Sequence, residues 1–266
     1  MTIPSGILTR RFCCPDISTE TATTDTAVHE LTDLLEISPM TIRILLTVAL
    51  LMSTFSLPGS ATADDHKLKA VKEVPKGLSP EIEKLINATG HQIQSEDGPV
   101  VELWMLKSLP IKANFKSSPS QLYPFTPGQL LGAMRVPKGA EYTDFRDQEI
   151  APGVYTLRYG LQPEDGNHLG TSETYDFILA LPAKHDTKAA TIDDFYELSE
   201  RSGKAAGSTH PAIFSLLDPA EAGKETKLEE DTANDDWVLT FTAKGNAKGK
   251  AAALKVRLVV IGESEA

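Results

Sequence analysis

The sequence predicts an all-β protein, an antiparallel β-sandwich with one or two short helices. From residue 91 onward, short segments alternate apolar and polar side chains with a period of two, the spacing of a half-buried strand. Turn-forming pairs such as Asp97-Gly98 and Pro152-Gly153 separate these segments. About seven short strands with such turns are typical of a sandwich, although the same alternation suits a small barrel.

A secretory signal peptide is predicted at residues 40 to 63. Arg43 supplies the positive start, residues 44 to 57 the apolar stretch, and Ala61-Thr62-Ala63 the small-residue cleavage site. The apolar stretch of 14 residues is shorter than the roughly 18 that a membrane-spanning helix needs. We therefore expect an exported protein, periplasmic or secreted, that keeps no membrane span after cleavage.

Residues 1 to 39 precede this signal, although signal peptides act at the N-terminus. We expect translation to start at Met40 and the upstream residues to be non-native; a disordered extension is the alternative. Residues 64 to 78 are rich in lysine and poor in large apolar side chains, which is typical of a linker. The remaining residues, 79 to 264, form the predicted sandwich domain.

The composition excludes some function classes. Without residues 1 to 63 the chain has 23 basic and 31 acidic side chains, a formal net charge of −8. This charge opposes binding to nucleic acid, because phosphate contacts dominate that affinity. Both cysteines, Cys13 and Cys14, lie in the removed part, so the exported form has no disulfide. Its 203 residues suit one sizeable domain that is stabilised by its hydrophobic core.

The predicted domain begins with a short helix. Ser79 is suited to the N-cap and Pro80 to the first helical position, and the helix ends by Gly90. Three strands are expected next, at residues 91 to 95, 100 to 106 and 130 to 136.

The clearest strand spans residues 154 to 161, where two sets of side chains alternate. One face carries Tyr155, Leu157, Tyr159 and Leu161, and the other carries Thr156 and Arg158. The next strand, residues 176 to 181, is apolar on both faces, which indicates a central position in a sheet.

The C-terminal part is predicted to hold a second helix and three more strands. Thr191 is the expected N-cap of a helix that ends before Gly203. The strands are expected at residues 212 to 217, 237 to 242 and 253 to 261. A loop at 244 to 250 joins the last two, and the acidic run 229 to 236 is interpreted as a solvated loop.

Residues 152 to 170, PGVYTLRYGLQPEDGNHLG, carry a resemblance to known families. The opening P-G-x-Y-x-L is similar to that of transthyretin-like and carboxypeptidase-regulatory-like sandwich modules. The longer string, of the type PGxYTLRYGLQPxDGNHxG, resembles an uncharacterised family of exported bacterial β-sandwich proteins. The resemblance implies the fold and transfers no activity or catalytic residue.

The loop after the clearest strand is a candidate site. Asp165, Asn167 and His168 combine a carboxylate, an amide and an imidazole, which could ligate a divalent metal. If strand ends meet, His210 would join His168 and Asp165 in one metal site. The alternative is structural: Asp-Gly-Asn is a common turn sequence, and a lone histidine such as His210 is commonly solvated.

Arg158 is a second candidate, because it lies on the outward face of a core strand. We expect it to pair with a carboxylate such as Asp144 or Asp176. With nearby aromatic side chains it could also bind a sugar, since exposed rings hold sugar rings and charged groups bond hydroxyls. The aromatic and basic side chains of this set are Tyr142, Phe145, Arg146, Arg158, Tyr159 and Tyr175.

Two functions remain open at this stage. We expect an exported, non-catalytic module that binds a protein partner or a glycan in the cell envelope and needs no cofactor. The alternative is a metal-dependent hydrolase or oxidoreductase that uses His168, His210 and Asp165. The sequence has no HExxH, G-x-S-x-G, phosphate-binding loop or dinucleotide-binding pattern to favour an enzyme.

Overall fold

The computed structural model describes residues 65–163, 172 and 174–264. It confirms the predicted fold class: two β-sheets, almost wholly antiparallel, with two short helices. The predicted signal peptide, residues 40 to 63, and the segment before it lie outside the described residues, so both stay predictions.

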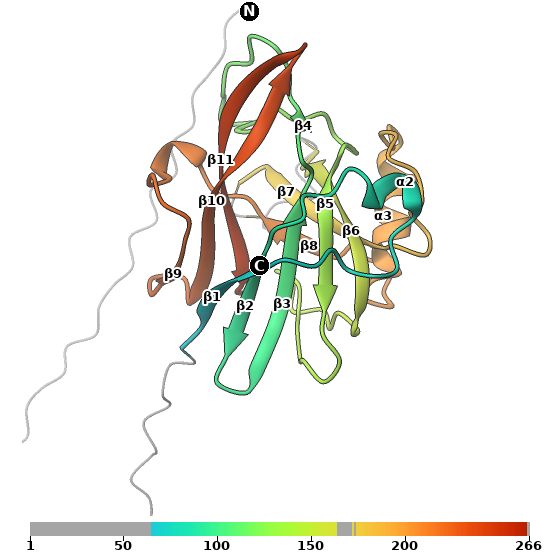
Figure 1. Cartoon of the computed structure of the whole chain (residues 1–266), viewed down its shortest axis with the longest axis vertical. Helices are drawn as coiled ribbons and strands as arrows, with labels where there is room; N and C mark the ends of the chain where they lie inside the picture. Colours follow the sequence, from blue (N-terminus) through green and yellow to red (C-terminus); the bar gives the residue numbers. More distant parts are fainter. Residues whose placement is uncertain (1–64, 164–171, 173, 265–266) are drawn as a thin grey trace, which may run out of the picture. The chain divides into compact units, whose positions relative to one another are not determined.

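The larger sheet has seven strands in the order β1-β2-β3-β5-β6-β7-β8, and each neighbouring pair is antiparallel. Its strands are β1 (Lys67–Val71), β2 (Gly90–Ser95), β3 (Gly98–Met105), β5 (Leu130–Val136), β6 (Gly153–Leu161), β7 (Asp176–Pro182) and β8 (Ile213–Ser215). Strands that follow each other in sequence are therefore neighbours in space, as in a meander. Figure 1 shows this progression from β1 to β6 across the front of the molecule.

The smaller sheet has a long hairpin at its centre. Its strands are β10 (Asp236–Ala247), β11 (Lys250–Ile261), β4 (Leu109–Pro110) and β9 (Lys227–Asp231). β11 and β9 pair antiparallel with β10, whereas the two-residue β4 pairs parallel with it. A bridge between Leu216 and Leu258 joins β11 to the chain just after β8, so the two sheets meet along one side.

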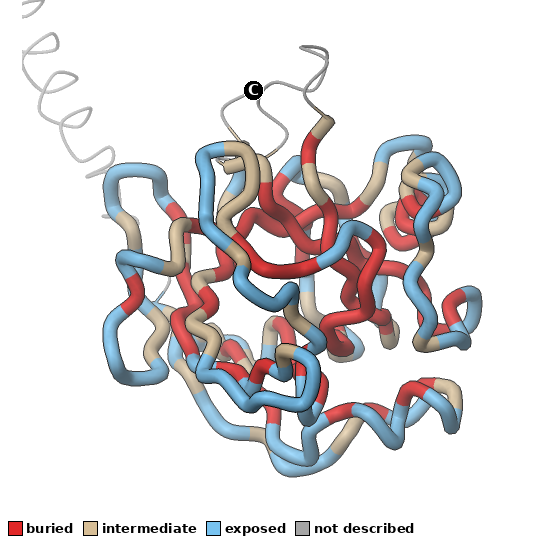
Figure 2. The backbone as a smooth tube through the Cα atoms, turned by 90° about the horizontal axis from the view of Figure 1, so that it is seen from above, coloured by how far each residue is buried: buried red, intermediate tan, exposed pale blue. Residues whose placement is uncertain are grey.

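The main core lies between the sheets. The side chains on one face of β6 point into it, as the alternation in the sequence predicts. Tyr155, Leu157 and Tyr159 are buried in this core, while Thr156 and Arg158 lie on the opposite face of the sheet. Seen from above, the buried parts of the chain are surrounded by exposed loops (Figure 2).

The outer face of the larger sheet is also covered, which is why β7 is apolar on both faces. Ile178 and Ala180 belong to the main core, whereas Phe177, Leu179 and Leu181 belong to a second cluster on the outer side. α3 (Phe195–Gly203) contributes Leu198 to this second cluster. The chain before β2 crosses in front of β3 and β5 in Figure 1 and carries α2 (Pro80–Glu83).

The first helix is confirmed and the second begins later than predicted. In α2, Ser79 is the N-cap, and its hydroxyl accepts a hydrogen bond from the Ile82 amide at 3.3 Å. In α3, the N-cap is Asp194, not Thr191, and the helix includes Gly203. The carboxylate of Asp194 accepts from the Glu197 amide at 3.0 Å. Asp competes well for this position because its oxygen satisfies an otherwise unpaired helix amide.

The predicted loop at 244 to 250 is wrong, because most of it is strand. β10 continues to Ala247 and β11 begins at Lys250, so the turn has only two residues, Lys248 and Gly249. Both have positive φ, 51° and 88°, as a type I′ hairpin turn requires. The β10–β11 hairpin therefore extends well beyond the rest of the smaller sheet (Figure 1).

Three other strands were not predicted. β1 falls within residues 64 to 78, which were expected to be a linker, and it pairs along its whole length with β2. β9 takes up part of the acidic run 229 to 236 that was expected to be a loop. β4 has only two residues, too few for alternation to reveal.

None of the helices in the described part of the chain is both long and apolar enough to cross a membrane.

Candidate functional site

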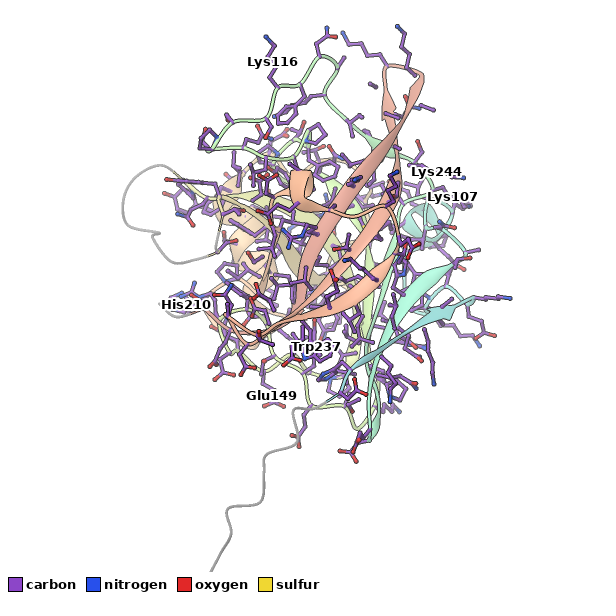
Figure 3. The ribbon with its side chains drawn as sticks, turned by 90° about the vertical axis from the view of Figure 1, so that its left-hand side faces the viewer. Lys107, Lys116, Glu149, His210, Trp237 and Lys244 are labelled. Carbon is purple, nitrogen blue, oxygen red and sulfur yellow. The ribbon has the colours of Figure 1, made fainter. Side chains whose placement is uncertain are left out.

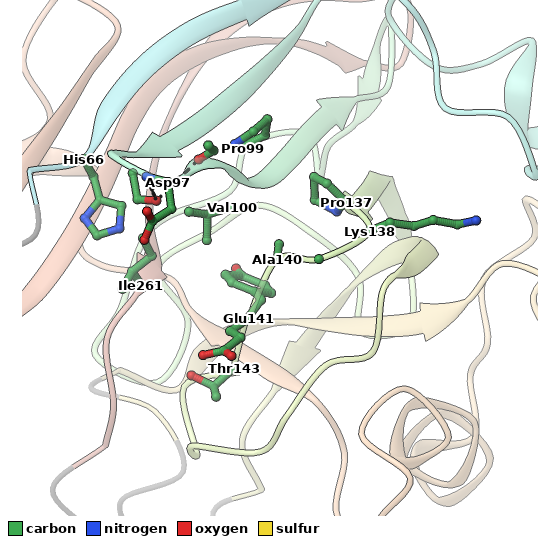
Figure 4. A pocket seen from close by; sticks show the side chains of 14 residues that line it. His66, Asp97, Pro99, Val100, Pro137, Lys138, Ala140, Glu141, Thr143 and Ile261 are labelled. Atoms are coloured by element: carbon green, nitrogen blue, oxygen red, sulfur yellow. Dashed lines mark hydrogen bonds between the residues drawn. The ribbon is translucent and has the colours of Figure 1, made fainter.

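An open depression of about 710 Å3 lies at one end of the sandwich. It is formed by the turn between β2 and β3, by residues 137 to 143 after β5, and by the end of β11 at Ile261. Other depressions among the described residues, of about 390 and 500 Å3, are smaller. Figure 4 shows His66, Asp97 and Ile261 together on one side of the larger one.

The lining of this depression is polar. Two exposed carboxylates, Asp97 and Glu141, provide hydrogen-bond acceptors, and the exposed Thr143 adds a hydroxyl. Tyr142 lines the floor, but its side chain is buried and its hydroxyl donates to the Val260 carbonyl at 2.8 Å. The carboxylates are therefore the groups best suited to hold a bound hydroxyl.

Two tight turns bring these residues to the same end of the molecule. Gly98 closes the β2–β3 hairpin with a φ of 132°, and Gly139 turns the chain after β5 with a φ of 85°. No atom lies within 4 Å of where a Cβ would be at either glycine, so both turns face open space. Since β3 and β5 are paired neighbours, the two turns lie beside each other.

A pair of aromatic rings borders the depression. The His66 ring, which lines it, meets the Trp237 ring edge to face at a centroid distance of 5.1 Å. Trp237 is partly exposed, whereas the other tryptophan, Trp104, is fully buried in β3. Of the two tryptophans, Trp237 is therefore the one whose fluorescence should respond to a ligand in the depression.

The predicted metal site is only partly described. Asp165, Asn167 and His168 lie outside the described residues, so no statement about them follows. His210 is exposed just before β8, and its backbone amide donates to the Ser208 hydroxyl at 3.0 Å. Figure 3 shows its side chain at the edge of the molecule.

Arg158 is fully buried, and its carboxylate partner is Asp186 rather than Asp144 or Asp176. Its Nε and Nη2 donate to the two carboxylate oxygens of Asp186 at 2.6 and 2.9 Å. Nη1 donates to the carbonyls of Gly128 and Ala190, and Nη2 also donates to that of Lys188. All five guanidinium N–H groups are therefore used within the protein, and none is left for a ligand.

Asp176 is also buried and occupied. Its Oδ1 accepts hydrogen bonds from the Tyr159 hydroxyl at 2.6 Å and the Tyr123 amide at 3.0 Å, and its Oδ2 accepts from the Leu122 amide at 2.8 Å. Burial raises the pKa of Asp176 above its ordinary value, although these hydrogen bonds oppose the shift. The carboxylate ties the segment before β5 to the start of β7.

Asp144 has a similar internal role. Its oxygens accept from the amides of Arg146, Gln148 and Ile213 and from the Gln148 side chain. Burial raises the pKa of this carboxyl as well. Neither expected partner of Arg158 is available to it.

Arg158 and Asp176, two of the predicted ligand-binding residues that the structure describes, do not converge. Arg158 lies opposite Leu179 on the outer face of the larger sheet, whereas Asp176 lies on the inner face beside the Tyr159 hydroxyl. Of the aromatic side chains proposed to hold a sugar, Tyr142, Phe145 and Tyr159 are buried, at 5, 4 and 0 % exposed. The expected sugar site on the β6 face is therefore not formed by these residues.

The residues of the depression were missed by the sequence analysis. Asp97 belongs to the recognised turn pair Asp97-Gly98, and Glu141 comes shortly after the strand that was predicted at residues 130 to 136. Only the pairing of β3 with β5 brings them to one place. His66 belongs to the segment that was interpreted as a linker, so nothing pointed to it.

Among the residues that the structure describes, no group of three or more His, Cys, Asp or Glu side chains is placed to hold a metal ion. No family model, curated protein or solved structure matches this chain. The site is therefore interpreted from its own geometry, as an open polar depression with two carboxylates and a neighbouring aromatic pair.

Proposed function

We propose that the chain is an exported, non-catalytic β-sandwich module that binds a glycan of the cell envelope. The observation that supports this proposal is the polar depression with the exposed carboxylates of Asp97 and Glu141. Sugar hydroxyls donate hydrogen bonds to carboxylates, and such charge-assisted bonds are stronger than neutral ones. The His66–Trp237 pair adds a ring surface beside them.

Tryptophan fluorescence tests this proposal. We expect short oligosaccharides of N-acetylglucosamine or of glucose to change the emission of the protein in a saturable way, and Trp237→Phe to abolish the change. Asp97→Asn and Glu141→Gln should each weaken the affinity by about tenfold, the value of one hydrogen bond to a charged group. Glu225→Gln, an exposed carboxylate outside the depression, is the matched control.

The proposal is contradicted if none of these sugars binds the protein. It is also contradicted if Asp97→Asn and Glu141→Gln bind the sugars as tightly as Glu225→Gln does. The enzyme alternative, which uses Asp165, His168 and His210, is separated by elemental analysis of the same protein. About one divalent metal per chain, lost in both His168→Ala and His210→Ala, would favour the enzyme.

A further inference from the structure

The outer edge of β11 is open over its first residues. The two-residue turn makes Ala247 and Lys250 the hydrogen-bonded closing pair of the hairpin. The backbone groups of every second residue from 251 onward, namely 251, 253 and 255, therefore point away from β10. Arg257 follows the same rule: its amide donates to the Tyr123 hydroxyl and its carbonyl accepts from the Leu217 amide.

Within the described residues, the protein makes its own hydrogen bonds to this edge of β11 at Arg257 but not closer to the hairpin turn. No hydrogen bond from a described residue reaches the backbone of residues 251, 253 or 255. Ala251, Ala252 and Ala253 are all exposed. The hairpin extends past the neighbouring strands at this end (Figure 1). An unpaired, exposed strand edge of this kind is a template for another strand.

The face beside this edge combines small side chains with lysines. Ala253 is paired with Lys244 of β10, and Ala251 with Asn246. A strand added to β11 would lie about 4.8 Å from it and about twice that from β10. Because alanine leaves the intervening space empty, acidic side chains on the added strand could reach over Ala253 to Lys244.

Positive charge is concentrated around the same end. Residues 237 to 262 contain no Asp or Glu, and neither do residues 103 to 140. β4 pairs with Gly245 and Asn246, which brings the second segment beside the hairpin. In Figure 3, Lys116 and Lys244 lie toward one end of the molecule and Glu149 toward the other. The exposed lysines of the two segments at this end are Lys107, Lys112, Lys116, Lys244, Lys248 and Lys250.

We propose that the open edge of β11, residues 250 to 255, binds an acidic, extended peptide segment of a partner protein, which adds to the smaller sheet as a further strand. The backbone of residues 251, 253 and 255 supplies the hydrogen bonds, and the lysines select acidic side chains. This site is distinct from the glycan depression, because the depression lies at the other end of the β10–β11 hairpin, beside Ile261.

The experiment uses residues 64 to 266 and a fluorescent peptide in which Glu alternates with Val. We expect saturable binding that weakens as salt increases. A peptide with Gln in place of Glu should bind about two- to fivefold more weakly, as should Lys244→Glu with the original peptide. Lys184→Glu, an exposed lysine away from the hairpin, is the charge-matched control and should bind normally.

Backbone pairing is tested separately with Ala253→Pro. Proline removes the amide that points away from β10, and an outward edge position tolerates it, so the protein should keep its circular dichroism spectrum while peptide binding is lost. Equal binding by Ala253→Pro, or by the Gln and Glu peptides, would overturn the proposal. So would an absence of binding by the unaltered protein, since the lysines would then only protect the edge. A concentration-dependent dimer that Ala253→Pro abolishes would instead assign the edge to a second copy of the chain.

Discussion

Arg158 shows how one buried side chain can hold several segments together. Its contacts join β6 to the loop at Gly128 and to residues 186 to 190. We expect Arg158→Met to lower the free energy of unfolding by about 3–5 kcal/mol, because it leaves the buried carboxylate of Asp186 unpaired. Urea denaturation measures this change.

The double variant Arg158→Met, Asp186→Leu controls for the stranded charge. It should recover a large part of the loss, since an apolar pair can replace a buried ion pair at little cost. Arg201→Met, which removes an ion pair with Glu197 at the surface, should change stability by less than about 1 kcal/mol. A loss at Arg158 no larger than that at Arg201 would mean that the buried network contributes little.

His91 makes stability depend on pH. It is partly buried in β2, where its ring lies 5.1 Å from that of Phe241, and burial lowers the pKa of His91 below its ordinary value of 6.5. As the pH falls through 6.5, His91 therefore takes up a proton in the unfolded chain before it does so in the folded protein. The free energy of unfolding decreases over this range, until the pH passes the lower pKa that His91 has in the folded protein.

We expect the urea midpoint to decrease as the pH falls below 6.5, and His91→Gln to flatten this part of the profile. His185→Gln, an exposed histidine, is the matched control and should leave the slope unchanged. An unaltered slope in His91→Gln would assign the pH dependence to another group.

The sequence predicted that Arg158 needs a carboxylate, but it pointed to Asp144 or Asp176 and not to Asp186. Alternation along β6 put the guanidinium on the opposite face from the core tyrosines, and a charged group there calls for a partner. Asp186 could not be recognised, because its position depends on the fold of the loop after β7. Local pattern specifies the face of a strand, whereas long-range contacts decide what covers that face.

At the scale of elements, the β10–β11 turn is strained by its sequence. Lys248 has a φ of 51°, in the left-handed region that costs an ordinary residue roughly 1–2 kcal/mol. We expect Lys248→Asn to raise the free energy of unfolding by up to about 1 kcal/mol, since Asn-Gly is a favoured type I′ pair. Thermal unfolding measures the gain. Lys250→Asn, just outside the turn, should give none, and an equal gain there would exclude a turn-specific effect.

The same turn explains why the hairpin was predicted too short. Lys-Gly is a weaker turn signal than Asn-Gly, and Ala251, Ala252 and Ala253 show no alternation. β5, by contrast, was predicted to the residue at Leu130–Val136, because its run of apolar side chains ends directly before Pro137. β1 and β9 were missed because they lie at sheet edges and carry few large apolar side chains, so tertiary pairing and not local propensity makes them strands.

At the scale of the whole molecule, two candidate surfaces lie at opposite ends of one hairpin. Trp237 and Ile261, a pair at its base, adjoin the depression, and Lys248 is at its tip. The acidic net charge inferred from composition conceals this separation, because Lys116 and Lys244 lie toward one end of the molecule and Trp237, beside the depression, lies toward the other (Figure 3). The net charge therefore argues against anionic partners for the protein as a whole, but it does not exclude them for the lysine-rich end.

The boundary of the folded unit yields the last prediction. β1 begins at Lys67, three residues after the predicted start of the exported form at Asp64, and its Leu68 and Val71 pack against the core. We expect residues 64 to 266 to unfold in one cooperative transition, and residues 77 to 266 to be less stable by about 2 kcal/mol or more, because the β1 ladder and its apolar contacts are lost. Urea denaturation compares the two forms. Equal midpoints would mean that residues 64 to 78 act as a linker, as the sequence alone suggests, and that β1 adds nothing to the stability of the sandwich.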